Sequence, residues 1–314
     1  MKNKSISRGV LFFLLTIFFV SSCTEDEIRP TFPLSADIFH SIVDKQVAFT
    51  ALTHSATSWS WDFGDGNSST EQNPVHIYEG GGYYLATLTA SDASGNTVVT
   101  EVNLAVALTP YVLLTGGAGA SGGKTWKLTA NHPAEDKLSN ADADFSIADG
   151  APETLPQGAF DLYLGMGEVY SDEFTFHFDG SYGHDVKDDG AAFGGIVYQF
   201  VMTGGAGIVN AGGADFGLCT GLYTPESGAT FTYVENEDFA VPSVYGPGGV
   251  LTYPGVSTLD FSGTEFVGLL DFQRKVILLE VTDNSMQIVM FMAASPDHLP
   301  MNTHALVLSF EVVN

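Results

Sequence analysis

The sequence predicts an all-β protein with two domains. Residues 124–314 contain many short β-rich runs separated by Gly or Asp-Gly, and they contain no convincing amphipathic helix. A chain of 314 residues with 45% apolar content has enough material for about two packed cores. Successive antiparallel hairpins predict that the second domain is a larger β-sandwich or jelly roll.

Residues 59–66 (WSWDFGDG) are the most informative stretch of the first domain. Trp59 and Trp61 are two residues apart, so on a strand they share one face. Gly64 and Gly66 permit backbone angles that a side chain would oppose, and the aspartate between them can accept hydrogen bonds from nearby amides. The segment therefore predicts a strand that ends in a glycine turn.

Two more extended runs follow this turn. They are residues 73–78 (NPVHIY) and residues 82–95 (GYYLATLTASDASG), and the second begins with an alternating strand. Together with WDFGDG, these motifs resemble the PKD domain, an immunoglobulin-like β-sandwich, over residues 36–107. The resemblance implies a spacer or interaction domain, so we expect the ligand chemistry to lie outside it.

The N-terminus has the pattern of a secretory signal. Three basic residues precede an apolar run at residues 10–20, which is shorter than the roughly 20 residues that span a bilayer. The following VSSC (residues 20–23) resembles a bacterial lipobox. This resemblance implies removal of residues 1–22 and lipid attachment at Cys23; an ordinary signal peptide cut near Ser22 is the alternative.

An acidic cluster at residues 24–27 (TEDE) follows the cysteine. It resembles the surface-export signal of lipoproteins in Sus-type polysaccharide-uptake systems, and it also fits a solvated tether over residues 23–35. The resemblance implies an outer-membrane protein that faces the cell exterior and is attached by its N-terminal lipid only. Outer-membrane components of glycan uptake are then expected partners.

The negative charge of the chain argues against nucleic acid as a partner. The formal net charge is −26, and removal of residues 1–22 leaves 8 basic against 37 acidic residues, or −29. Such a surface repels nucleic acid and anionic lipid headgroups. The two cysteines, Cys23 and Cys219, offer no disulfide or zinc site if Cys23 carries lipid, and we expect Cys219 to be a small buried residue.

The predicted second domain, residues 124–314, follows a glycine-rich linker at residues 108–123. Its KTWKL run (residues 124–128) and the hairpins predicted within 172–184 and 276–292 resemble the C-terminal modules of PKD-bearing surface lipoproteins that bind polysaccharide. The resemblance implies that polysaccharide is the partner of this domain.

The first candidate site is the hairpin around Asp179-Gly180. If these two residues form the turn, His177 lies opposite Tyr182, and Thr175 lies opposite His184. That face could bind sugar hydroxyls or, through its imidazoles, a metal ion. A solvent-exposed face with cross-strand pairing is the alternative.

Exposed aromatic rings are the second candidate, because the apolar face of a pyranose can stack on them. Tyr245 and Tyr253 flank a Pro/Gly-rich stretch that reads as a loop, and Tyr223 precedes Thr-Pro. Each of these tyrosines could instead pack its own loop. Trp126 is a further candidate, although its apolar run favours burial.

A weak calcium hypothesis concerns Asp142, Asp144 and Asp149, which place oxygen ligands on alternate residues. Phe145 stands where an EF-hand needs its glycine, and Ala151 stands where it needs its glutamate. A different kind of calcium loop or an acidic surface loop remains open. No other cofactor is expected.

Catalytic motifs are missing from the sequence: it has no nucleophile elbow, no HExxH and no phosphate loop in the right context. We therefore expect a cell-surface lipoprotein that binds a neutral polysaccharide, for which a β-glucan is the example the resemblance suggests, without cleaving it. The alternatives are a glycoside hydrolase on the same scaffold and a structural or adhesive surface protein.

Replacing Cys23 by Ala tests the predicted anchor. Because a single thiol carries the acyl group, C23A should abolish lipid labelling and release the protein from membranes. Metabolic labelling and membrane fractionation measure both effects. Unchanged membrane partitioning of the variant would show that the chain is not a lipoprotein.

Overall fold

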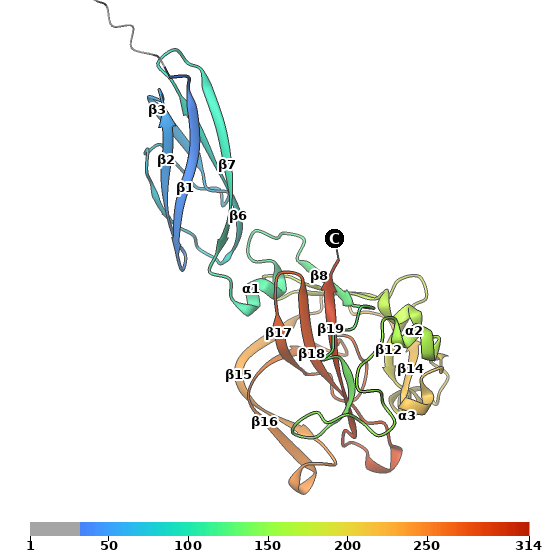
Figure 1. The fold of residues 1–314 in the computed structure, drawn as a ribbon. Helices are drawn as coiled ribbons and strands as arrows, with labels where there is room; N and C mark the ends of the chain where they lie inside the picture. The colour runs from blue at the N-terminus through green and yellow to red at the C-terminus, as the bar shows by residue number, and fades with distance from the viewer. Residues whose placement is uncertain (1–31, 314) are drawn as a thin grey trace, which may run out of the picture.

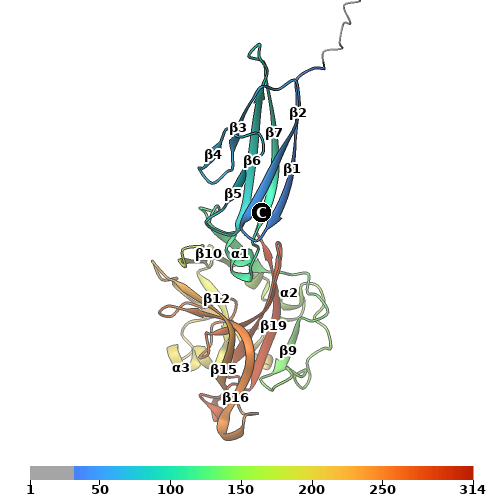
Figure 2. The ribbon, with the colours of Figure 1, turned by 90° about the vertical axis from the view of Figure 1, so that its left-hand side faces the viewer.

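The computed structural model describes residues 32–313 and arranges them as two β domains in an elongated molecule (Figures 1 and 2). The predicted all-β class and the order of a small sandwich followed by a larger curled one are confirmed. The signal peptide, Cys23 and most of the acidic tether lie outside the described residues. Within residues 32–313, no helix is long and apolar enough to cross a bilayer.

The first domain is a sandwich of two antiparallel sheets, ordered β1-β2-β5 and β4-β3-β6-β7. Alternation builds it, since every second residue of β6 is buried and the intervening ones are more exposed. Trp61, Phe49 and Tyr78 fill the space between the sheets. The strands are β1 (Ser35–Val43), β2 (Gln46–His54), β3 (Ser58–Asp62), β4 (Ser68–Ser69), β5 (Val75–Ile77), β6 (Gly82–Ser91) and β7 (Thr97–Val106).

The glycine turn after β3 forms as predicted. Gly64 has φ +78°, and a Cβ there would lie 2.5 Å from the carbonyl oxygen of Leu85, so only glycine fits. Asp65 accepts hydrogen bonds from the amide of Asn67 at 3.0 Å and contacts His76 Nε2 at 2.7 Å. The turn therefore ties β3 to the extended run that carries His76.

The glycine-rich linker at residues 108–123 contains a short helix and contacts both domains. Helix α1 (Pro110–Thr115) is capped by Thr109, whose Oγ1 accepts from the Val112 amide at 3.3 Å. The helix carbonyl of Leu114 accepts the Trp126 indole N–H of the second domain at 2.9 Å. Gly117 pairs with Gly82 of β6, so the linker contacts both domains.

A nine-stranded antiparallel sheet forms the frame of the second domain. Eight strands follow the order β11-β10-β8-β19-β18-β17-β16-β15, and β9 pairs with β19 beside β8. The strands are β8 (Lys124–Leu128), β9 (Lys137–Asn140), β10 (Glu173–Phe176), β11 (Tyr182–Asp185), β15 (Phe231–Pro242), β16 (Val250–Phe261), β17 (Val276–Val281), β18 (Ser285–Met292) and β19 (His304–Val312).

A second, three-stranded sheet and short helices cover one side of this frame (Figure 1). Its order is β12-β14-β13, with helix α3 leading out of β12. The elements are α2 (Ala159–Leu164), η1 (Gly167–Tyr170), β12 (Ala191–Gly195), α3 (Ile196–Thr203), β13 (Ile208–Asn210), η2 (Ala214–Phe216) and β14 (Leu218–Leu222). Two further 3-10 turns lie in strand connections, η3 (Pro247–Gly249) between β15 and β16 and η4 (Pro296–His298) between β18 and β19.

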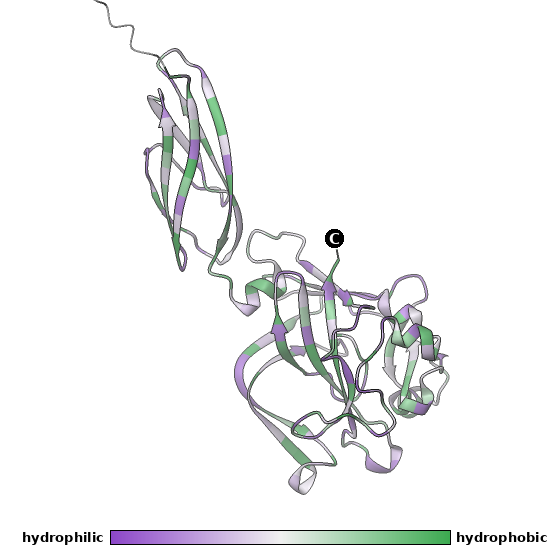
Figure 3. Cartoon of the chain, viewed as in Figure 1, coloured by the Kyte–Doolittle hydropathy of each residue, from purple (hydrophilic) through white to green (hydrophobic). Residues whose placement is uncertain are grey.

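Both faces of strand β19, in the middle of the large sheet, carry buried residues. Leu306, Leu308 and Phe310 of β19 belong to the core that faces the three-stranded sheet, whereas Ala305 and Val307 belong to a second core. Apolar residues also gather on α2 and α3 at the outside of the domain (Figure 3), where their exposure reaches 67% for Leu162 and 57% for Phe200.

Replacing Trp61 by Ala should destabilise the first domain by about 3–5 kcal/mol, because it empties a large and fully buried aromatic site. Trp59 on the same strand is only partly buried, so W59A is the matched control and should cost clearly less. Urea denaturation of both variants measures the difference. Equal losses would contradict the central place of Trp61 in this core.

Candidate ligand-binding cleft

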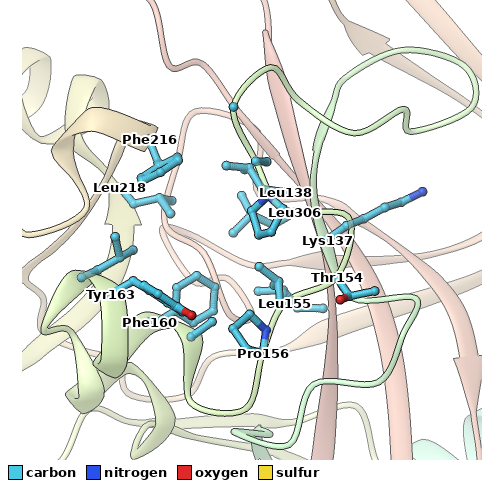
Figure 4. Close-up of a pocket in the computed structure, with 16 residues that line it drawn as sticks. Lys137, Leu138, Thr154, Leu155, Pro156, Phe160, Tyr163, Phe216, Leu218 and Leu306 are labelled. Carbon is cyan, nitrogen blue, oxygen red and sulfur yellow. The ribbon is translucent and has the colours of Figure 1, made fainter.

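A cleft of about 710 Å³ opens between the large sheet and the helical side of the second domain (Figure 4). Strand β9 is four residues long, so the sheet is short on this side of β19. The chain then leaves β9 in an irregular segment, residues 141–158, and returns as helix α2. A space remains between β9, this segment and α2, and its volume lies in the usual range for small-molecule sites.

Aromatic residues form one wall of the cleft. Helix α2 supplies Phe160 and Tyr163, and Phe216 comes from η2 just before Leu218 of β14 (Figure 4). Tyr163 is 67% exposed and Phe216 is 37% exposed, whereas Phe160 is buried. The two exposed rings therefore lie toward the mouth of the cleft.

Aliphatic residues form the opposite wall and the deep end. Leu138 of β9 and Leu306 of β19 are paired on adjacent strands, so their side chains lie side by side on one face of the sheet. Leu155 and Pro156 line the side of the cleft (Figure 4). Lys137 borders the cleft, but its ammonium points away from the other lining side chains (Figure 4).

No carboxylate, imidazole or thiol lines the cleft. None of its 16 residues is Asp, Glu, His, Ser or Cys. The lining is Lys137, Leu138, Gly150, Ala151, Pro152, Thr154, Leu155, Pro156, Ala159, Phe160, Tyr163, Leu164, Phe216, Leu218, Leu306 and Leu308. Glycoside hydrolysis needs two carboxyl groups across the scissile bond, and this lining does not supply them.

A buried hydrogen-bond chain holds helix α2 in place. His132 Nδ1 lies 2.8 Å from Asp136 Oδ2, and His132 Nε2 lies 2.9 Å from the Tyr170 hydroxyl. That hydroxyl in turn accepts from the amide of Phe160 at 3.1 Å. Ser309 of β19 donates to Asp136 Oδ1 at 2.7 Å. Hydrogen bonds between largely buried polar groups thus connect the sheet to the first turn of α2. They hold the aromatic residues of α2 at a set position beside the cleft.

Burial raises the pKa of Tyr170 to about 12, so its hydroxyl keeps its proton at neutral pH. Both ring nitrogens of His132 lie within hydrogen-bond distance of a partner, Nδ1 of Asp136 and Nε2 of Tyr170. Every polar atom named in the chain has a partner, which is the arrangement of a structural network.

Three candidate ligand residues are buried. For Tyr253 and Tyr182 the prediction of an exposed position is wrong, whereas burial of Trp126 is the outcome that its apolar run favoured. Trp126 is 0% exposed and bonds to α1. Tyr253 is 5% exposed because strand β16 extends through it, and its ring stacks on Phe145 at 5.0 Å. Tyr182 is 5% exposed and donates to the Phe266 carbonyl at 2.6 Å.

The predicted register of the hairpin is wrong by one residue. His177 bonds to Ser181 at 3.0 Å, so the loop has three residues and ends in Gly180 with φ +87°. Tyr182 therefore pairs with Phe176 and turns into the core, away from His177. His184 pairs with Phe174, and its buried Nδ1 lies 3.3 Å from Glu265.

Two predicted tyrosines keep some exposure but lie outside the cleft. Tyr245 is 47% exposed between β15 and β16, and its hydroxyl donates to Asn140 Oδ1 at 2.9 Å. Tyr223 is partly buried against Phe266, and its hydroxyl donates to the Thr264 carbonyl at 3.2 Å. A ligand contact by Tyr245, Tyr223 or His177 stays a prediction.

The structure does not bring the three predicted calcium ligands, Asp142, Asp144 and Asp149, together around one point. Asp142 accepts from the amides of Asp144 at 3.2 Å and Ser146 at 3.0 Å, so its carboxylate caps its own loop. Across residues 32–313, no group of three or more His, Cys, Asp or Glu is placed to hold a metal ion. Asp149 is therefore not brought together with Asp142 and Asp144 as a metal site.

Sequence reasoning missed Tyr163 and Phe216. Tyr163 belongs to a six-residue helix between Gly158 and Gly165, and Phe216 belongs to a single 3-10 turn. Both elements are too short for helical periodicity to be read from the sequence. The glycines on either side of residues 159–164 were the one available signal, because each takes a left-handed conformation.

Comparisons with known proteins identify the first domain. Residues 40–106 match the family model of the PKD domain, and the N-terminal sandwich is a PKD domain as predicted. Collagenase ColQ1 of Bacillus cereus (strain Q1) is 47% identical over 49 residues, which is 16% of this chain. The chain spans 5% of the length of that relative, and 11% of the related ColA, to which it is 29% identical.

Solved structures give weaker likenesses. The PKD1 domain of Vibrio anguillarum Epp is 26% identical, with a TM-score of 0.24 over 25% of this chain and 99% of that domain. A carbohydrate-binding module of the β-sandwich superfamily covers 91% of this chain and 94% of its own, with 14% identity and a TM-score of 0.24. Neither score is high enough to argue function for the second domain.

A buried carboxyl makes the stability of the chain depend on pH. Asp172, just before β10, is 3% exposed. Its pKa is raised from 3.8 to about 8, chiefly by burial and also by the nearby carboxylates of Asp189 and Asp185. Because the folded pKa exceeds the unfolded one, its stabilising contribution is complete below about pH 4 and is lost as the pH rises through about 8.

D172N should therefore lose less stability than the wild type between about pH 4 and pH 8. Urea denaturation across this range measures the slopes. D188N, which alters an exposed neighbouring carboxylate, is the control and should follow the wild type. Parallel curves for the wild type and D172N would contradict a raised pKa at Asp172.

Proposed function

We propose that this chain is an exported surface lipoprotein whose second domain binds extracellular polysaccharide in the cleft beside α2 and does not cleave it. The lipid is proposed to attach at Cys23 and to hold the protein at the outer membrane, facing outward. Outer-membrane components of glycan uptake are the proposed protein partners. These assignments rest on the sequence pattern of residues 1–27.

The lining of the cleft is the observation that carries the proposal. Two exposed aromatic rings, Tyr163 and Phe216, lie at the mouth of a cleft whose volume suits a small ligand. The apolar faces of sugars stack on rings of this kind. The lining holds no carboxylate pair. This combination supports binding over hydrolysis, because a glycosidase needs both carboxyl groups within reach of the bound sugar.

Charge supports a neutral ligand. The chain has a formal charge of −26, and the ammonium of Lys137, the one basic group in the lining, points away from the cleft. An anionic glycan would meet a repulsive field with no paired cation to offset it. Binding is therefore proposed to depend only weakly on salt, since stacking is little screened.

The PKD domain supports the surface role as a spacer. The described chain begins at the end of this domain that is remote from the second domain (Figure 1). A chain tethered at its N-terminus would thus hold the cleft away from its point of attachment. The folded linker gives that spacer a defined junction.

Replacing Tyr163 or Phe216 by Ala should weaken polysaccharide binding roughly 2- to 12-fold each, the loss expected for one aromatic stacking partner. Affinity gel electrophoresis of the full chain against a panel of neutral soluble polysaccharides measures the shift. Both side chains are exposed, so the melting temperature should change little.

F200A changes an exposed aromatic residue outside the lining and is the matched control, which should bind as the wild type does. Y245A tests the competing position at the β15–β16 end. Loss of binding in Y245A with full binding in Y163A would move the site to the β15–β16 end. Release of reducing sugars by the wild type would show a hydrolase. Failure to bind any member of the panel would favour a structural or adhesive role.

A further inference from the structure

The cleft changes its chemistry with depth. Its mouth carries the hydroxyl of Tyr163 and that of Thr154, beside the exposed ring of Phe216. Its deep end is lined by buried members of the set, among them Phe160 (5%), Leu138 (8%), Leu218 (2%), Leu306 (1%) and Leu308 (1%). None of these five side chains can donate or accept a hydrogen bond.

The backbone does not supply the missing polar groups at Leu138 and Leu306. These two residues are paired with each other in the β9–β19 ladder, and Leu306 is also paired with Met290 of β18. The Leu138 carbonyl accepts the amide of Ala148 at 3.1 Å. A hydroxyl group that reached this part of the cleft would therefore lose its hydrogen bonds to water without gaining new ones.

An unsubstituted pyranose fits the mouth but not the deep end. Its ring has apolar C–H faces that can lie on Tyr163 and Phe216, while hydroxyls surround its rim. Burying those hydroxyls against leucine side chains is unfavourable because they would stay unpaired. The part of a ligand that fills the deep end must instead be hydrocarbon.

We infer that the cleft takes an acylated saccharide, with the sugar ring at Tyr163 and Phe216 and an ester- or amide-linked acyl group against Leu138, Leu218 and Leu306. This inference rests on the proposed function and narrows its ligand class. The acyl chain gains by leaving water, and the neutral sugar stays hydrated at the open mouth. The aliphatic side chains at the deep end of the cleft, Leu138, Leu218 and Leu306, are called the floor below. They are what distinguishes an acylated glycan from a plain one.

A series of alkyl β-D-glucopyranosides tests the inference with the full chain. Isothermal titration with the methyl, butyl, hexyl and octyl glucosides, each below its micelle concentration, gives affinity against chain length. Affinity should rise about fourfold for each added CH₂ until the floor is filled. Hexanol should bind more weakly than hexyl glucoside, because it lacks the sugar that contacts the mouth.

The substitution L155Q places an amide beside the floor and should flatten this series. Leu155 is partly buried and lines the cleft. The matched control is L162Q on α2, a residue that is 67% exposed and outside the lining, and it should leave the series unchanged. Acetylated glucomannan, assayed before and after mild alkali, carries the test to a polysaccharide, and removal of its acetyl groups should weaken binding.

The outcomes separate this inference from the proposed function. A flat alkyl series, together with equal binding of native and alkali-treated polysaccharide, overturns the acyl inference and leaves polysaccharide binding standing. A steep series with no binding of any polysaccharide keeps the acyl floor and overturns the proposed function. Hexanol binding as tightly as hexyl glucoside overturns the saccharide half, and equal effects of L155Q and L162Q overturn the location.

Discussion

Burial of both faces of strand β19 is the constraint on which the second domain depends. Leu306 and Leu308 face one core and Ala305 and Val307 face another, so apolar material must cover the sheet on both sides. The three-stranded sheet with its helices covers one face. The distal part of the β15–β16 hairpin, with Tyr253, covers the other. A strand with two buried faces tolerates little change, and we expect the frame of the cleft to be rigid.

The cleft exists because the elements that cover one face of the large sheet do not fill the space beside β9. Strand β9 pairs with only part of β19, and the segment after it must cross to α2 without filling the space between them. The His132–Asp136–Tyr170 chain then fixes α2 at a set position from the sheet. A site built this way is largely formed before a ligand arrives, so less conformational freedom is lost on binding.

Hydrogen bonds connect the PKD domain, the linker and the second domain at their junction. Tyr83 of the PKD domain contacts Asp283 in the turn between β17 and β18 through its hydroxyl, and Gly117 of the linker pairs with Gly82. Helix α1 bonds to Trp126 on the other side. The PKD domain is therefore joined to the second domain through hydrogen bonds, and this junction fixes how the cleft is oriented relative to the PKD domain.

The sequence determined the PKD sandwich, because the strand that carries Trp61 and the glycine turn that follows it are recognisable as local patterns. It also determined the hairpin near Asp179-Gly180, but not its register, since the His177–Ser181 bond adds a loop residue and turns Tyr182 into the core. Only the tertiary structure decided the candidate site. Tyr163 and Phe216 are 53 positions apart in residue number, and they line one cleft because the second domain packs α2 and η2 beside the large sheet; no local pattern encodes that arrangement.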